Sequence, residues 1–206
     1  MAIFNELRRI FKRQKFNVIL LRHIIGLPAG PGDPIDVVRH ILEKTPINIA
    51  EHFNFEMITR SQCVQGCRPV EVTREVRQSC HAMNAEVDMD MAAIVQSTII
   101  RENGVCQQCQ GNALLIRSMH GSETQKYAVV NMGQPANIVG LRGGVPTEFF
   151  GTTWKLIGYT RYIPNMEHYV SHIWNGEHFL FVNDHTISHE QMEMKDVNML
   201  IFERSE

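Results

Sequence analysis

A chain of 206 residues, of which 44% are hydrophobic, is long enough to bury one sizeable core or two small ones. The formal net charge of −2 gives no basic field for nucleic acid, and no stretch reaches the roughly 18 consecutive apolar residues of a membrane span. We therefore expect neither nucleic acid nor a membrane as a partner. The N-terminal sequence MAIFNELRR has no apolar segment followed by a cleavage site, which predicts an intracellular protein of the cytoplasm or nucleus.

Helices are predicted in the first quarter of the chain. Residues 3–25 mix apolar and basic side chains and predict one or two helices with a solvated basic face. Residues 27–34 hold three prolines and two glycines and predict a loop. Asp33 is a suitable N-cap and Pro34 suits the first helical position, so a further helix is expected from Pro34 to about Lys44, ahead of Pro46. Its buried face would consist of Ile35, Val38, Ile41 and Leu42.

Beyond this helix the hydrophobic period changes from that of a helix to two. Alternating residues predict half-buried antiparallel strands at 53–58, 70–72 and 87–91, followed by a short helix at about 92–100. Later strands are predicted at 114–117, 126–132, 154–161, 167–174, 177–182 and 198–202. The sequence therefore predicts an α+β fold, with helices first and an antiparallel sheet after them.

Four of the five cysteines form two close pairs. Three residues separate Cys63 from Cys67, and two separate Cys106 from Cys109. Two such turns can supply the four thiolates of a tetrahedral structural zinc site. The 38 residues between the pairs exceed the about 15–20 residues of a usual zinc ribbon, so the ligands would have to meet around an inserted sheet and helix. Reduced, partly buried thiols remain an alternative. The fifth cysteine, Cys80, is interpreted as a small core residue.

Residues 167–184 predict a β-hairpin. The dipeptide Asn175-Gly176 between aromatic and β-branched runs is typical of a two-residue turn. That turn would pair Trp174 with Glu177 and, counting back, His168 with Asn183. Directly opposed residues have Cβ atoms about 4.5–5.5 Å apart, so the imidazole and the carboxamide are expected to hydrogen-bond.

A histidine held by asparagine is the pair of base and orienting residue found in cysteine hydrolases. The alternative is that His168 only ends a strand and Asn183 begins a turn. A metal bound by His168 and His172 is disfavoured, because residues four apart on one strand are about 13 Å apart.

Together these motifs resemble the ubiquitin-specific proteases, which are papain-like deubiquitinases with a thumb, a palm and fingers. That family carries a Gly-His-Tyr box, then an aromatic residue, an Asn or Asp followed by Asp, and a final apolar strand. The corresponding segments here are Glu167-His168-Tyr169, Phe179, Val182-Asn183-Asp184 and residues 199–202. The widely spaced cysteine pairs resemble the family's zinc ribbon, and the helix that begins after Asp33 resembles its thumb helix.

The resemblance implies a papain-like cysteine peptidase fold. Residues 1–50 would form a helical remnant of the thumb, residues 51–126 the zinc-binding fingers, and residues 127–206 the palm. His168 would be the general base, Asn183 its orienting residue and Asp184 a polar neighbour. The implied partners are ubiquitin or a ubiquitin-like protein, together with other proteins.

Two departures from the family pattern bear on activity. The family's nucleophile lies in an N-terminal box of the type Gly-Asn-Thr-Cys, whereas no cysteine precedes Cys63 in this sequence. Glu167 stands where the family has glycine, and a carboxylate there would obstruct the Gly-Gly tail of ubiquitin. We therefore expect a pseudoenzyme that acts as a ubiquitin- or protein-binding module.

Two other functions remain open on the sequence alone. The chain would be the C-terminal part of an active deubiquitinase if a cysteine box lay upstream or on a partner. Alternatively, it is a zinc-stapled scaffold with no relationship to ubiquitin.

Overall fold

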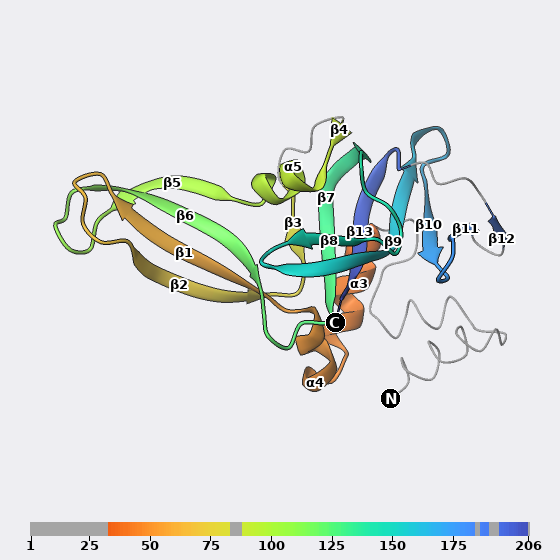
Figure 1. Cartoon of the computed structure of the whole chain (residues 1–206), viewed down its shortest axis with the longest axis horizontal. Helices are drawn as coiled ribbons and strands as arrows, with labels where there is room; N and C mark the ends of the chain where they lie inside the picture. Colours follow the sequence, from red (N-terminus) through yellow and green to blue (C-terminus); the bar gives the residue numbers. More distant parts are fainter. Residues whose placement is uncertain (1–32, 83–87, 184–185, 190–193, 206) are drawn as a thin grey trace. The chain divides into compact units, whose positions relative to one another are not determined.

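The computed structural model describes residues 33–82, 88–183, 186–189 and 194–205. The chain divides into two compact units, residues 1–50 and residues 51–206. Figure 1 shows the described helices and strands of both. None of the described helices has the length and apolar character that crossing a membrane requires.

The described part of the first unit contains two helices. Helix α3 spans Pro34–Glu43 and α4 spans Ile47–Ala50. Asp33 caps α3, because its carboxylate oxygen accepts a hydrogen bond from the backbone N–H of Ile35 at 3.0 Å. The helix predicted after the proline-rich segment is thus confirmed, but of its predicted buried face only Leu42 is buried, whereas Ile35, Val38 and Ile41 are half-buried. The helices predicted in residues 3–25 and most of the predicted loop lie outside the described residues.

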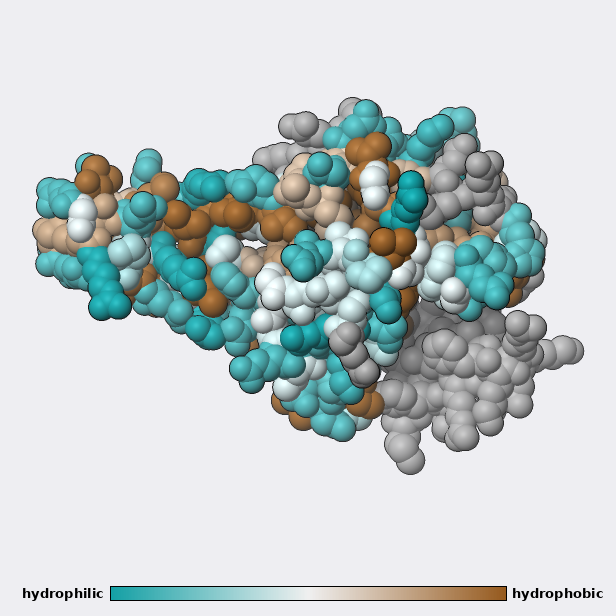
Figure 2. All heavy atoms as spheres, in the orientation of Figure 1, coloured by the Kyte–Doolittle hydropathy of each residue, from teal (hydrophilic) through white to brown (hydrophobic). Residues whose placement is uncertain are grey.

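A four-stranded antiparallel sheet forms one part of the second unit. It follows the short 3-10 helix η1 (Glu51–Phe53), and its strand order is β2-β1-β6-β5. The bounds are β1 Phe55–Cys63, β2 Val70–Arg77, β5 Ile100–Val105 and β6 Asn112–Gly121. Hydrophobic and hydrophilic side chains are intermixed on its surface in Figure 2.

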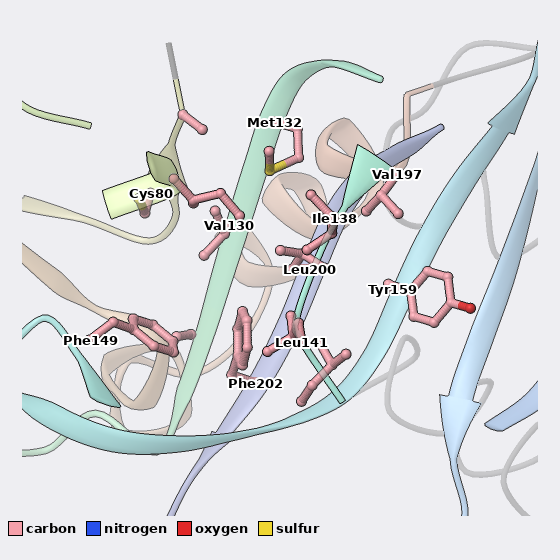
Figure 3. Packing of buried hydrophobic residues seen from close by; sticks show 14 of the residues in the cluster. Cys80, Val130, Met132, Ile138, Leu141, Phe149, Tyr159, Val197, Leu200 and Phe202 are labelled. Carbon is pink, nitrogen blue, oxygen red and sulfur yellow. The ribbon is translucent and has the colours of Figure 1, made fainter. Parts of the chain in front are cut away.

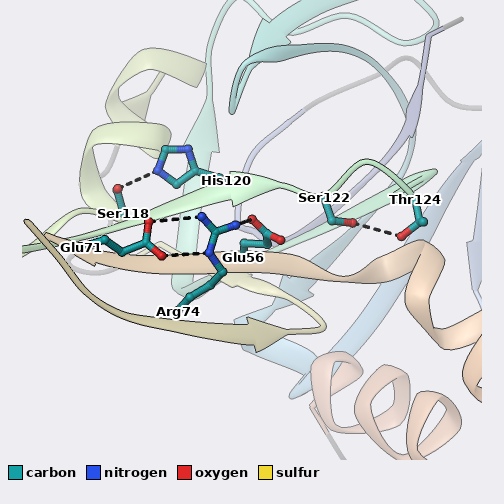
Figure 4. Close-up of polar contacts among 7 residues, drawn as sticks. All are labelled: Glu56, Glu71, Arg74, Ser118, His120, Ser122 and Thr124. Carbon is teal, nitrogen blue, oxygen red and sulfur yellow. Dashed lines mark hydrogen bonds and ion pairs between the residues drawn. The ribbon is translucent and has the colours of Figure 1, made fainter.

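The outer strand β2 carries charged side chains that form ion pairs. Arg74 donates hydrogen bonds to Glu56 on β1 at 2.6 Å and to Glu71 at 3.0 Å, as Figure 4 shows. A β-bulge interrupts the pairing of β1 and β2 after Thr59. Charged side chains and bulges are the devices by which exposed sheet edges avoid pairing with other chains.

A nine-stranded sheet forms the larger part of the second unit. Its strands follow the order β12-β11-β10-β9-β13-β7-β3, with β4 beside β7 and β8 beside β9. Helix α5 (Met91–Ser97) and the 3-10 helix η2 (Pro164–Met166) lie between its strands in the sequence. The bounds are β3 Cys80–His81, β4 Asp88–Met89, β7 Tyr127–Ile138, β8 Pro146–Phe149, β9 Thr152–Ile163, β10 His168–Trp174, β11 Phe179–Asn183, β12 Thr186–His189 and β13 Val197–Arg204.

Strands dominate the described residues, and the sheets are mainly antiparallel, so the predicted α+β class holds in its broad sense. The antiparallel strand predicted at 87–91 was wrong. Among the described residues of this segment, only Asp88–Met89 forms a strand, and it runs parallel to β7, as β3 does. The N-cap of α5 at Asp90, whose side chain accepts from the N–H of Ala93, ends the strand after two residues.

The main core lies on the nine-stranded sheet. In Figure 3 Phe149, Leu200 and Phe202 belong to the packed cluster, and Phe149 and Phe202 meet edge to face with ring centroids 4.7 Å apart. Trp154 is fully buried, and its indole N–H donates to the carbonyl of Phe149 at 3.1 Å. Each such buried side chain contributes roughly 1.5–3 kcal/mol of hydrophobic stabilisation.

A side chain at the end of the last strand, β13, binds the loop that connects the two sheets. At the end of β13, one guanidinium nitrogen of Arg204 donates to the carbonyl oxygens of Ser122, Glu123 and Gln125 at 3.1–3.3 Å. These residues form the loop from β6 to β7. The N–H of Lys126, at the end of this loop, donates to the carbonyl of His52, which precedes β1. This hydrogen bond also holds the loop in place.

Candidate functional site

The hairpin of β10 and β11 forms, but its register differs by two residues from the prediction. Trp174 pairs with Phe179, so four residues make the turn instead of two. The side-chain oxygen of Asn175 accepts hydrogen bonds from the N–H groups of Glu177 and His178, both at 3.0 Å. A two-residue Asn-Gly turn needs positive φ at both residues, whereas only Gly176 has it here. The predicted direct pairings of Trp174 with Glu177 and of His168 with Asn183 were therefore wrong.

His168 and Asn183 nevertheless meet. The imidazole Nε2 lies 2.8 Å from the carboxamide Oδ1 of Asn183. Because strand side chains alternate between faces, a shift of two residues keeps both side chains on one face. Asn183 then reaches His168 along the diagonal of the strand pair. The third predicted residue, Asp184, lies outside the described residues.

This hydrogen bond indicates which nitrogen of the His168 ring carries a hydrogen. The carboxamide oxygen only accepts, so Nε2 carries the hydrogen that is directed at Asn183. Proton uptake at the second nitrogen is what a general base does when an amide orients its ring.

Glu167, directly before His168, has a left-handed backbone. Its φ is 47° and its ψ is 41°, and it ends the 3-10 helix η2 with its N–H directed at the carbonyl of Pro164. Glycine adopts this conformation without steric cost, whereas a residue with a Cβ is strained there. The sequence identified Glu167 as a departure from glycine but gave no sign of this backbone conformation.

A second histidine lies fully buried on the same strand. The ring of His172 stacks on Tyr159 with centroids 4.3 Å apart and planes within 4°. Burial, with a smaller contribution from Arg161, lowers the pKa of His172 to about 4. Neither of its ring nitrogens has a hydrogen-bond partner among the described residues. His172 is thus a neutral core residue, and sequence periodicity showed only that it shares a face with His168.

The four paired cysteines come together at the end of the four-stranded sheet that is remote from η1. The sulfur atoms of Cys63, Cys67, Cys106 and Cys109 all lie within 4.8 Å of one another, and those of Cys63 and Cys109 are 3.5 Å apart. A tetrahedral zinc site with Zn–S bonds of about 2.3 Å has sulfurs roughly 3.8 Å apart. The predicted metal-binding arrangement is confirmed, and its donor set fits structural zinc.

Strand pairing explains how the two distant pairs meet. Strand β6 lies between β1 and β5, so the turn after Cys63 and the turn after Cys106 end up side by side. In the first turn Gly66, at φ 84°, donates to the carbonyl of Cys63. In the second, Gln110, at φ 59°, donates to the carbonyl of Cys106. The 38 intervening residues therefore include two strands of this sheet, β2 and β5, two short strands of the other sheet and helix α5.

Two of the clustered cysteines have thiol pKa values that are shifted in opposite directions. Backbone N–H groups, chiefly that of Cys67 and also that of Gln65, lower the pKa of Cys63 to about 6 despite its burial. Hydrogen bonds to the sulfurs of Cys109 and Cys63 raise the pKa of Cys67 to about 12. A divalent metal requires all four sulfurs as thiolates, so binding would release the shared protons.

Cys80 lies elsewhere, in strand β3. It is fully buried in the main core, and this burial raises the pKa of its thiol. A buried thiol with a raised pKa is unreactive. The interpretation of Cys80 as a core residue is confirmed.

Comparison with known proteins shows similarity at the level of structure only. No protein-family model matches the sequence, and neither does any curated protein. One similar solved structure is the SAGA DUB module of a Ubp8 variant with Sgf11, Sus1 and Sgf73, with a TM-score of 0.58 and 12% identity over 84% of this chain and 46% of that chain. A second is a SAGA DUB module of another Ubp8 variant with Sgf11, Sus1 and Sgf73, bound to monoubiquitin. Its TM-score is 0.60, with 12% identity over 94% of this chain and 49% of that chain.

These similarities establish a shared fold. The chain spans about half the length of the two chains it matches. At 12% identity, function must be argued from the site.

Proposed function

We propose that this chain is a domain resembling the ubiquitin-specific proteases, which binds ubiquitin or a ubiquitin-like protein without cleaving it. Residues 1–50 would correspond to the thumb, 51–126 to the fingers and 127–206 to the palm. The observation that carries the proposal is the combination of a four-cysteine site in one sheet with the hydrogen-bonded pair His168–Asn183 in the other. Two unrelated sequence signals thus occur together on the fold of the DUB module chains.

The arrangement of the cysteines supports a non-catalytic role. All five cysteines lie in described residues, and none belongs to β9, β10 or β11. Four of them form the metal-binding cluster of the other sheet. The fifth, Cys80, lies in β3, four strand positions from β10, which corresponds to about 19 Å across a sheet. A cysteine hydrolase needs its thiol within hydrogen-bond reach of the base, so these cysteines cannot act with His168.

Binding of ubiquitin is inferred from the shared fold. One of the similar structures is described as bound to monoubiquitin, and it matches 94% of this chain. A fold can keep a binding surface when a catalytic group is missing, because the two depend on different residues.

Ubiquitin reagents test this proposal. The zinc-loaded chain is expected to bind ubiquitin in a calorimetric titration, to leave a ubiquitin–fluorophore substrate intact and to form no adduct with a ubiquitin vinyl probe. An adduct at any cysteine would overturn the non-catalytic role. Absence of affinity for ubiquitin and for ubiquitin-like proteins would instead favour an unrelated zinc-stapled scaffold.

A second candidate function is the base half of an active cysteine deubiquitinase. The observation that favours it is the intact hydrogen bond from His168 to Asn183, which a purely structural sheet does not require. The nucleophile would come from another segment or from a partner chain. A coding sequence for a Gly-Asn-Thr-Cys-like segment upstream of Met1 would support this candidate, and its absence would count against it.

A further inference from the structure

Glu167 keeps a side chain in a backbone conformation that favours glycine, directly beside the candidate site. Its φ of 47° places the Cβ against the neighbouring carbonyl oxygen, which destabilises the folded state. Strain of this kind persists where another requirement maintains it, and it is concentrated at functional sites.

The other described non-glycine residues at positive φ have evident structural roles. Gln110 shapes the turn after Cys106. Phe150 packs its ring against Phe55, with centroids 5.4 Å apart. Asp196 accepts a backbone hydrogen bond at 2.9 Å from the N–H of Tyr162 on β9.

Glu167 has no such role among the described residues. Its side chain is exposed and forms no hydrogen bond or ion pair with any of them, so the fold gains nothing visible from the carboxylate. Packing and pairing therefore do not explain why a glutamate occupies this position.

The position of Glu167 indicates what the carboxylate does. Its Cα lies about 3.8 Å from that of His168, since the two residues are adjacent. The imidazole of His168 is held in place by its hydrogen bond to Asn183. Glu167 is exposed at the end of η2, so a chain segment that reaches His168 along this end of β10 passes an exposed carboxylate. A segment that ends in a free carboxylate is repelled further.

We propose that Glu167 closes the His168–Asn183 site to the carboxyl-terminal tail of a bound ubiquitin-like protein. The partner is then held by surfaces outside this site, and its tail stays in solvent. This inference rests on the proposed function and specifies how the site treats its partner.

The test compares two forms of ubiquitin, one complete and one lacking the terminal Gly-Gly, in calorimetric titrations of the zinc-loaded chain. The chain itself is expected to bind both forms with affinities within about twofold of each other. Glu167→Gly removes the carboxylate and the strain, and it should bind the complete form about tenfold more tightly than the shortened one. Glu167→Gln, which removes only the charge, should give an intermediate preference.

Glu177→Gln is the matched control, because Glu177 is an exposed glutamate in the turn at the other end of β10. It should show no preference between the two forms. A strong preference for the complete form in the unaltered chain, or no gain of preference in Glu167→Gly, would overturn the role of Glu167 while leaving ubiquitin binding intact. If no variant binds either form, the proposed function falls and this inference falls with it.

Discussion

The hydrogen bond between His168 and Asn183 is the contact on which the interpretation of the larger sheet depends. It holds the ring in the tautomer with hydrogen on Nε2. An accidental contact at the end of a strand would leave the ring free to exchange tautomers, so the two interpretations differ in a measurable property.

Asn183→Ala should release this tautomer. The nitrogen resonances of His168 should move from values typical of a single tautomer toward averaged values, and the free energy of unfolding should fall by about 1 kcal/mol. Nitrogen-15 NMR of the ring and chemical denaturation measure the two effects. Asn165→Ala, in the exposed turn of η2, is the control and should change neither. Unchanged ring resonances in Asn183→Ala would show that the contact does not orient His168.

His172 makes stability depend on pH. Its pKa is about 4 in the folded state and about 6.5 in the unfolded chain. Above pH 6.5 both states are neutral at this residue and its effect is constant. As the pH falls from 6.5 to 4 the unfolded state takes up the proton first, so stability is lost over this window, by an amount on the order of 2 kcal/mol.

His172→Phe should remove most of this dependence, because phenylalanine keeps the stacking on Tyr159 and does not titrate. The measurement is the free energy of unfolding from urea denaturation between pH 4 and pH 7. His178→Phe, at a half-buried position in the turn after β10, should retain the dependence of the unaltered chain. Equal slopes for His172→Phe and the unaltered chain would contradict the assignment.

Backbone strain at Glu167 predicts a stabilising substitution. Glycine relieves a cost of about 1–2 kcal/mol for a left-handed residue but adds conformational entropy to the unfolded chain, so Glu167→Gly should gain about 0.5–1 kcal/mol. Thermal unfolding measures the change. The same substitution at Glu177, which has negative φ, should not stabilise. Destabilisation by Glu167→Gly would show that the side chain supports the fold.

At the scale of elements, sequence patterns found most strands but not their register. The dipeptide Asn175-Gly176 is typical of a two-residue turn, and periodicity alone offered no reason to reject it. The competing hydrogen bonds from the Asn175 side chain to two N–H groups lengthened the turn. His168 and Asn183 still lie on one face of the sheet, because the register differs from the predicted one by an even number of residues.

Strand β5 shows a different limit of sequence reasoning. The segment Ile100–Val105 contains only two apolar residues besides a glycine, so neither period is visible in it. Its pairing with β6 makes it a strand, and tertiary contacts of this kind leave little trace in local sequence.

The stability of the two turns that carry the paired cysteines should depend on bound metal. The chain is expected to contain about one zinc per molecule, and Cys106→Ser should lose the metal and lower the midpoint of thermal unfolding. Elemental analysis and calorimetry measure these effects. Cys80→Ala is the control, because Cys80 lies in the core of the other sheet, and it should keep its zinc. Fewer than about 0.3 zinc per chain with unchanged folding in chelator would contradict a structural metal site.

At the scale of the whole second unit, we expect its stability to depend on the hydrogen bonds between Arg204 and the loop from β6 to β7. Arg204→Ala leaves three carbonyl oxygens without this donor and should lower the free energy of unfolding by about 2–3 kcal/mol. Urea denaturation measures the loss. Arg142→Ala, at an exposed position of the same unit, should change stability by less than about 0.5 kcal/mol. A similarly small effect of Arg204→Ala would show that the junction is held elsewhere.

The overall architecture was predictable only where local signals were strong. The sequence predicted the capped helix after Asp33, the cluster of the paired cysteines and most of the strands that alternate in hydrophobicity. The parallel additions of β3 and β4 to β7 were not predictable, since two-residue strands have no period to detect.

The central claim is that the chain binds ubiquitin and leaves it intact. The most direct measurement is a nitrogen-15 NMR titration of labelled ubiquitin that carries a short carboxyl-terminal peptide extension, with the zinc-loaded chain as titrant. We predict saturable shifts at one surface of ubiquitin, with the resonances of the extension unchanged over a day. A spectrum that does not change at any ratio, or the appearance of signals from a newly formed terminal glycine, would contradict it.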